Sequence, residues 1–129
     1  MSYDESFTTS GICGFPTRFE WVGTGYGTIF TDAAGNFVSQ RDRIRETLTV
    51  TNTHTGVWLS GWDAYQISVD AQNTFVRVGL WFHLTSPGYG VLLHDVGRAV
   101  FSDGELVSRG GAHDWLDGNF EALCSALGG

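Results

Sequence analysis

The sequence predicts an all-β fold, an antiparallel meander of about eight strands with a short C-terminal helix. Apolar and polar residues alternate with a period of two along most of the 129-residue chain, which is typical of half-buried strands. Turn-forming clusters rich in Gly, Asn and Asp separate these segments at intervals of about 8–12 residues. Such a meander closes as a barrel or folds as a two-sheet sandwich. Two long strands in the second half favour the barrel, because long, tilted strands suit closure.

The strands follow one another with short turns between them. In chain order they are expected at residues 17–22, 28–30, from 37 onward, 47–51, 57–59, 65–69, 74–85, 91–101 and 105–108. The turns fall at 32–36, 52–56, 70–73, 86–90 and 102–104. A two-residue turn at Gly88 and Tyr89 would pair His83 with His94 across the last long hairpin.

The end of the chain changes to a helical period. Four apolar residues stand at i, i+3, i+4 and i+7, namely Phe120, Leu123, Cys124 and Leu127. They predict a short helix over residues 117–127. We expect residues 1–12 to form an N-terminal arm and residues 13–129 to form one domain, which the chain length also favours.

Composition excludes several classes of protein. A hydrophobic content of 42% with only 16% charged residues is not that of a disordered chain. No apolar run approaches the ~20 residues of a membrane span. The first ten residues are polar and acidic, so no signal peptide is expected in them. The formal net charge of -7 opposes binding to nucleic acid or to anionic membranes. The alternating charges of residues 41–46 are interpreted as a solvated strand.

The two cysteines, Cys13 and Cys124, stand near opposite ends of the chain. A disulfide between them would fasten the helix to the start of the domain, and would suit an oxidising compartment. The location expected on this basis is extracellular or on the surface of a particle. The alternative is a pair of separate buried thiols, because free cysteine packs as a small hydrophobe. Zinc-type cysteine spacings are absent, and no metal or other cofactor is expected.

Several short motifs together resemble a group of small, mostly exported actinobacterial proteins. They are the Cys-Gly-Phe-Pro sequence at 13–16, residues 32–36, 81–83 and 87–91, Gly-Ala-His at 111–113, Gly-Asn-Phe at 118–120 and Leu-Cys at 123–124. The resemblance spans most of the chain and implies a β-domain with paired cysteines. The group has no agreed activity. This sequence is expected to depart from the group, because no export signal is predicted in its first ten residues.

Candidate binding residues lie on the central hairpin. One face of it is expected to hold Arg77, Trp81, His83, His94 and Arg98, opposite an apolar row from Val76 to Leu84. His83 and His94 would sit about 5 Å apart, close enough to share a proton or a metal. Two imidazoles are an incomplete metal site, however, and the alternative is that this face is simply solvated.

Asp95 is the second candidate. In the same register it falls among apolar residues that face the core, where desolvation raises a carboxyl pKa and produces an acid–base group. A bulge that turns the side chain outward, or a basic partner, is the alternative. The five tryptophans either line a ligand cavity or fill the core.

Two functions follow from these residues. The first is a non-enzymatic, disulfide-stabilised β-domain that binds a protein surface or a small apolar ligand, or assembles as an oligomer or particle shell. The alternative is a cofactor-free cyclase or isomerase that uses Asp95, His83 and His94 in an aromatic lumen. A closed pocket with convergent polar groups favours the second, whereas a filled interior excludes it.

Overall fold

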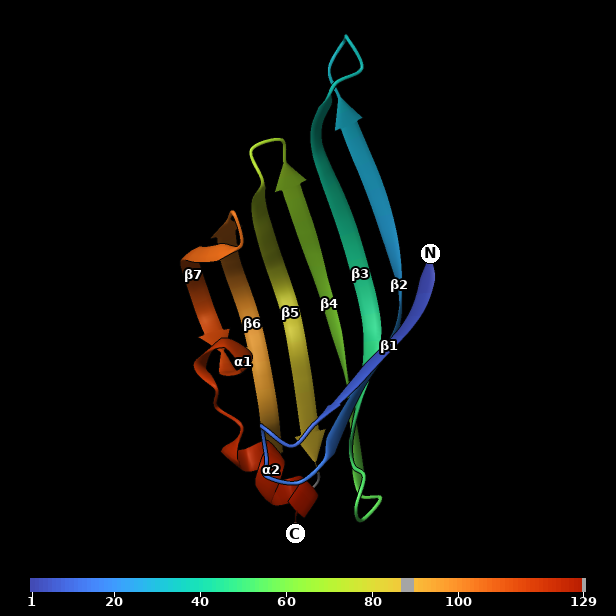
Figure 1. Ribbon diagram of the computed structural model, residues 1–129, viewed down its shortest axis with the longest axis vertical. Coiled ribbons are helices and arrows are strands. Elements are labelled where there is room, and N and C mark those ends of the chain that lie inside the picture. Colours follow the sequence, from blue (N-terminus) through green and yellow to red (C-terminus); the bar gives the residue numbers. More distant parts are fainter. Residues whose placement is uncertain (87–89, 129) are drawn as a thin grey trace.

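The protein folds as one antiparallel sheet whose seven strands are arranged in sequence order (Figure 1). The computed structural model describes residues 1–86 and 90–128. The strands are β1 (Ser2–Thr9), β2 (Thr17–Thr31), β3 (Phe37–Asn52), β4 (Trp58–Asp70), β5 (Thr74–Ser86), β6 (Gly90–Ser102) and β7 (Glu105–His113). Two helices follow, α1 (Asp114–Asp117) and α2 (Glu121–Gly128). Neither has the length and apolar character needed to cross a membrane.

The all-β antiparallel meander is confirmed, but its closure as a barrel is not. Within the described residues the sheet runs from β1 at one edge to β7 at the other, and these two strands do not pair. The segments expected at 17–22 and 28–30 form one long strand, β2, because the glycines between them remain extended and paired to β3. Residues 1–12, expected as an arm, contain β1, which adds an edge strand to the sheet. The tip of the last long hairpin, at 87–89, lies outside the described residues.

The two faces of the sheet differ in burial. The inner face carries the hydrophobic core, in which Phe19, Leu48, Val50, Leu84 and Leu93 are fully buried. Both helices pack at one end of this face (Figure 1). There Phe7 of β1 contacts Trp115 of α1, with ring centroids 6.4 Å apart, so the first and last elements of the fold meet. The sheet is therefore curled around its inner face without closing.

A row of glycines crosses the last three strands. Gly79 pairs with Gly97, and Gly97 with Gly111. All three have φ between 96° and 130°, a region that other residues rarely adopt. A Cβ atom on Gly97 would lie 2.1 Å from the Gly110 carbonyl oxygen, so no larger side chain fits. The row lets β5, β6 and β7 lie close together as the sheet curls.

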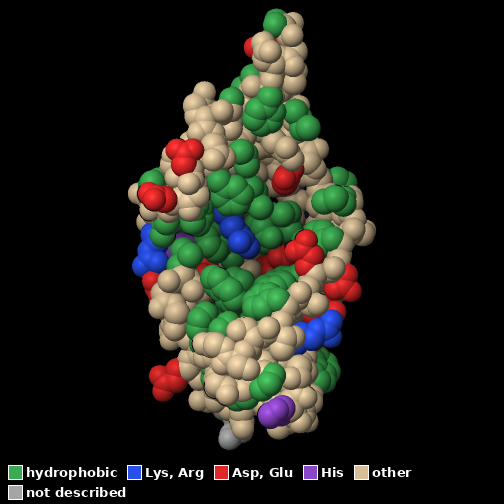
Figure 2. Space-filling view, in the orientation of Figure 1, with side chains coloured by type: hydrophobic (Ala, Val, Ile, Leu, Met, Phe, Trp, Pro, Cys, Tyr) green, Lys and Arg blue, Asp and Glu red, His purple; other side chains and the backbone are tan. Residues whose placement is uncertain are grey.

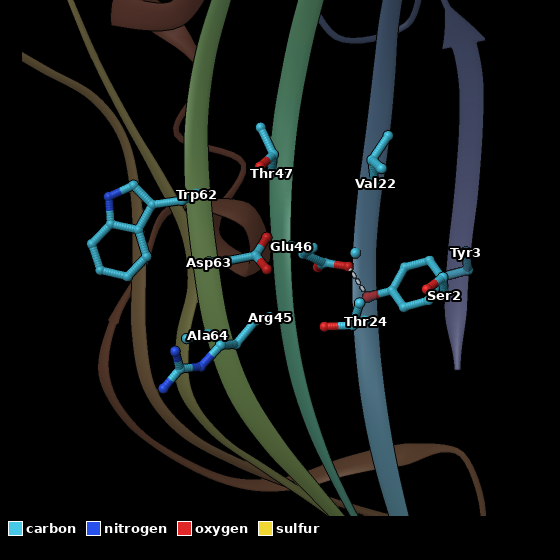
Figure 3. Close-up of a pocket in the computed structure, with 11 residues that line it drawn as sticks. Ser2, Tyr3, Val22, Thr24, Arg45, Glu46, Thr47, Trp62, Asp63 and Ala64 are labelled. Atoms are coloured by element: carbon cyan, nitrogen blue, oxygen red, sulfur yellow. Dashed lines mark hydrogen bonds between the residues drawn. The ribbon is translucent and has the colours of Figure 1, made fainter.

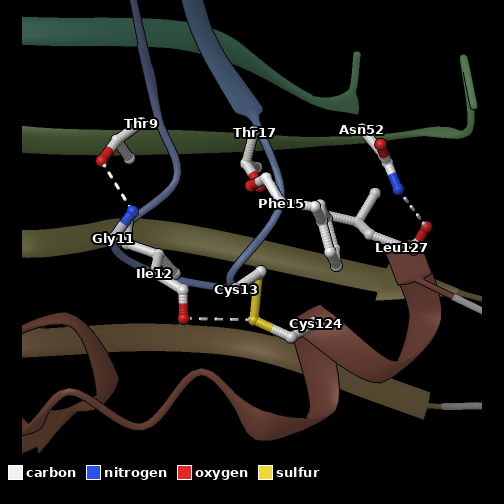
Figure 4. The surroundings of a disulfide bond; sticks show 9 residues. All are labelled: Thr9, Gly11, Ile12, Cys13, Phe15, Thr17, Asn52, Cys124 and Leu127. Carbon is white, nitrogen blue, oxygen red and sulfur yellow. Dashed lines mark hydrogen bonds between the residues drawn. A yellow bond between two sulfur atoms is a disulfide. The ribbon is translucent and has the colours of Figure 1, made fainter. Parts of the chain in front are cut away.

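The predicted disulfide is present. Cys13 and Cys124 are bonded, with Cα atoms 5.3 Å apart, and join the β1–β2 connection to α2 (Figure 4). A hydrogen bond of 3.2 Å from the Asn52 side-chain amide to the Leu127 carbonyl holds the other end of α2. The helical segment starts earlier than expected and is divided in two, because Gly118 adopts a left-handed conformation that ends α1. The molecule is thus a disulfide-stabilised, antiparallel β-domain.

Candidate functional site: an aromatic cup on the inner face

The inner face is hollowed above the core. The hollow, here called the cup, has a volume of about 410 Å³. Its lining comes from the six strands β1–β6 and from α1, and consists of Glu5, Trp21, Glu46, Tyr65, Phe75, Arg77, Trp81, Phe82, Phe101, Trp115 and Leu116. Figure 2 shows this face of the molecule, with hydrophobic side chains around a central depression and charged groups inside it. The curled sheet therefore leaves an open space, large enough for a small molecule, between its strands and α1.

Aromatic rings form most of the cup. Phe82 stacks on Trp115 with centroids 4.8 Å apart, and Trp21 lies 6.1 Å from Phe82. Trp81 and Phe82 are consecutive, yet both are buried, because β5 has a bulge between Leu80 and Phe82 where pairing to β6 shifts. Of the five tryptophans, three line the cup, whereas Trp58 and Trp62 are 62% and 55% exposed on the outer face.

Arg77 is held between two of these rings. Its Cζ atom lies 4.0 Å from the centroid of Tyr65 and 4.4 Å from that of Trp81, close enough for cation–π attraction to both. Among the described residues it forms no ion pair. Its Nε–H and the indole N–H of Trp81 are buried and have no acceptor in that part of the chain. Two side chains that line the cup thus each carry a buried hydrogen-bond donor without an acceptor among the described residues.

Two carboxyl groups face each other beside the cup. Glu46 of β3 stands directly opposite Asp63 of β4, and Figure 3 shows the Asp63 side chain directed toward Glu46. Glu46 also accepts a hydrogen bond from the Tyr3 hydroxyl, which reaches it across β2. Gly23 makes this possible, because a Cβ atom there would lie 2.6 Å from the Cβ of Glu46. A more open hollow of about 690 Å³ reaches the same three polar side chains from β1–β4.

Asp63 retains its proton at neutral pH. It is 1% exposed, and burial is the main cause that raises its pKa, to about 9, with the neighbouring Glu46 adding to the effect. Arg77 opposes the shift only in part. Neither carboxyl oxygen of Asp63 has a donor among the described residues. A retained proton accounts for this, because it makes Asp63 a donor facing the Glu46 carboxylate. Burial, followed by the bond to Glu46, likewise raises the pKa of Tyr3.

Asp95 lies where the sequence placed it, fully buried on the inner face, but it is paired. Its Oδ1 is 2.6 Å from Nδ1 of His113, and its Oδ2 accepts the Trp115 backbone N–H at 3.1 Å. The other ring nitrogen of His113 is 2.8 Å from the Gly110 carbonyl oxygen. Burial lowers the pKa of His113, but these hydrogen bonds and the charge of Asp95 outweigh it and the pKa is raised. The pair anchors the start of α1.

The five expected binding residues do not share one face. His83 and His94 are paired as predicted, with Nδ1 atoms 3.3 Å apart, but they lie on the outer face beside Trp62. Arg98 pairs with Val78 and is exposed there too, whereas Arg77 and Trp81 line the cup. The expectation that the row from Val76 to Leu84 faces the core is wrong for its first half, because the bulge near Leu80 exchanges the faces. Within the described residues no three His, Cys, Asp or Glu side chains cluster as metal ligands.

The sequence pattern did not predict the three polar residues Tyr3, Glu46 and Asp63 beside the cup. For Glu46 a signal existed, since period-two alternation puts it on the same face as Leu48 and Val50. For Tyr3 and Asp63 there was none, because their position depends on strand register.

Comparison of the chain with protein-family models, with curated proteins and with solved structures finds no match.

Proposed function

We propose that this protein binds a small, flat, largely apolar molecule in the cup. The observation that supports it most strongly is the aromatic hollow itself, whose volume of about 410 Å³ falls within the ~300–1,000 Å³ of ordinary ligand sites. Three tryptophans and four phenylalanines or tyrosines line this space rather than filling it. A flat apolar guest stacks on such rings and removes their surface from water, at roughly 25 cal/mol per Å².

A recessed site favours a small molecule over a protein surface or self-assembly. The aromatic rings of the cup lie inside the curl of the sheet, where the flat face of another domain does not reach them. Action outside the cytoplasm is part of the proposal, supported by the Cys13–Cys124 disulfide, because such bonds persist in oxidising compartments. The acidic balance supports a partner other than nucleic acid.

The proposal is tested with N-phenyl-1-naphthylamine, an uncharged, planar probe that fluoresces in apolar sites. It is expected to bind with one-to-one stoichiometry. Trp21→Leu, inside the cup, should weaken binding about tenfold, as loss of a buried aromatic contact predicts. The matched variant Trp58→Leu, on the outer face, should bind as the wild type does. Equal binding by the two variants, or no saturable binding, would contradict the proposal.

The second candidate is a cofactor-free isomerase or cyclase that acts on the same guest. It is favoured by Glu46, which lines the cup and faces a carboxyl group that holds a proton. Such a pair can take a proton from one carbon of a substrate and return it to another. The test is the conversion of cyclohex-3-en-1-one to its conjugated isomer, followed by absorbance. Acceleration that is lost in Glu46→Gln but kept in Glu20→Gln, a partly exposed residue paired with Arg18, supports catalysis, and no acceleration over buffer contradicts it.

A further inference from the structure

We propose that the guest of the cup carries an acidic oxygen, a carboxylate or phenolate, that Arg77 and Trp81 bind. The inference rests on the proposed function and adds the chemical class of the ligand. Its basis is the pair of buried N–H groups on these two side chains, which lack acceptors among the described residues. A buried donor left unpaired destabilises the empty site, so a ligand that supplies the acceptor removes this cost on binding.

The two donors belong to side chains that pack on each other. Arg77 and Trp81 stand four residues apart on β5, and the guanidinium lies 4.4 Å from the indole ring. Trp81 is only 2% exposed, so its N–H does not reach bulk solvent. Tyr65 covers the other side of the guanidinium. Because the rings fix its plane before any ligand arrives, little side-chain entropy is lost when its edge binds an oxygen.

The charges in the cup leave Arg77 available for an anion. Glu46 accepts from Tyr3 and faces the protonated Asp63, so its charge already has donors. Glu5 is exposed to solvent at the edge of the cup. Arg77 is the only basic residue in the lining, and it forms no ion pair within the part of the chain that the structure describes. A bidentate contact with a carboxylate satisfies the guanidinium, and charge-assisted bonds of this type are about twice as strong as neutral ones.

A matched pair of probes separates recognition of charge from binding of the apolar body. 8-Anilinonaphthalene-1-sulfonate has the rings of N-phenyl-1-naphthylamine plus one sulfonate. Wild type should bind the sulfonate at least about tenfold more tightly than the neutral probe, since one charge-assisted contact is worth that much. Arg77→Leu should abolish this preference, so that the two probes bind the variant with the same affinity. Trp81→Phe keeps an aromatic ring but removes the N–H together with the second ring of the indole, and it should weaken binding of the sulfonate probe by about two- to fivefold.

The control is Arg98→Leu, which removes the same charge from the exposed outer face and should change neither affinity. Thermal melts verify that each variant is folded. If Arg77→Leu does not fold, Arg77→Lys keeps the charge but loses Nε, and it should bind the sulfonate with intermediate affinity. A preference that survives in Arg77→Leu, or equal affinity of wild type for both probes, overturns the inference and leaves the proposed function intact. If neither probe binds, both the inference and the proposed function are overturned.

Discussion

Tyr3 and Glu46 are hydrogen-bonded across an intervening strand, over the glycine at position 23. On its other side Glu46 faces Asp63, so the carboxylate on β3 lies between a phenol on β1 and a carboxyl group on β4. Each of these groups is costly to bury alone, and together they satisfy one another only if Asp63 keeps a proton. The cluster therefore joins the edge strand β1 to the middle of the sheet and sets the charge balance beside the cup.

Replacing Asp63 by Asn should stabilise the protein at alkaline pH. The pKa of Asp63 is about 9 in the folded state against 3.8 as its ordinary value, so between these pH values the folded chain binds the extra proton. Stability contributed by this group therefore falls as pH rises from about 4 to 9. The side-chain amide of asparagine can donate a hydrogen bond to Glu46 and does not ionise in this pH range. Urea unfolding at pH 8 should show Asp63→Asn more stable by about 1–3 kcal/mol. A variant that is less stable than wild type at pH 8 would contradict the shared-proton arrangement.

Asp95→Asn should destabilise the fold, and more at low pH than at high pH. The raised pKa of His113 means that the ion pair contributes its full stability below about pH 6.5, and that this is lost as pH rises through the folded pKa. Breaking a buried pair costs about 3–5 kcal/mol. Denaturant unfolding at pH 6 and pH 9 measures the difference. Glu20→Gln, in the exposed pair with Arg18, serves as control and should cost less than about 1 kcal/mol. Equal losses for the two variants would count against the assigned role of His113.

Gly23→Ala should disrupt the Tyr3–Glu46 contact. A Cβ atom at this position would lie 2.5 Å from the Arg45 carbonyl oxygen and 2.6 Å from the Cβ of Glu46, so backbone must move. The expected loss of stability is about 1–3 kcal/mol. Gly25→Ala is the matched control on the same strand, because its nearest neighbours would be 3.6 Å away, an ordinary contact. Thermal unfolding of the two variants tests the prediction, and equal melting temperatures would refute it.

Removal of the disulfide should destabilise the domain strongly. The Cys13–Cys124 bond closes a loop with a sequence separation of 111 residues, for which the chain-entropy account gives about 4–5 kcal/mol. The double variant Cys13→Ser/Cys124→Ser and the reduced wild type should both unfold at lower urea concentration. Intact-mass measurement with and without reductant should show the bond in the native protein. Two free thiols in native protein would disprove it.

Much of the fold could be predicted from the local pattern of apolar and polar residues. The alternation of apolar and polar residues predicted the antiparallel strands. The helical spacing of Leu123 and Leu127 predicted the two most buried positions of α2. The register of the His83–His94 pair followed from the hairpin itself. Asp95 was placed on the buried face for the same reason. These features depend on residues that are near each other along the chain.

The cup depends on features that local pattern does not encode. One bulge near Leu80 turns Trp81 inward beside Phe82 and puts Arg77 on the inner face, against the alternation of the apolar row. Whether the sheet closes depends on how far it curls between β1 and β7, which the glycines at 79, 97 and 111 influence through tertiary contacts. The pairing of Glu46 with Asp63 likewise needs the register of a whole hairpin.

The most direct test of a guest in the cup uses the indole N–H signals of the five tryptophans in a ¹⁵N-labelled sample. Three of these rings, at Trp21, Trp81 and Trp115, line the cup, while Trp58 and Trp62 lie on the outer face. Addition of N-phenyl-1-naphthylamine should shift the three inner signals in a saturable manner and leave the two outer signals in place. Shifts confined to the signals of Trp58 and Trp62, or no saturable shift at all, would contradict binding in the cup.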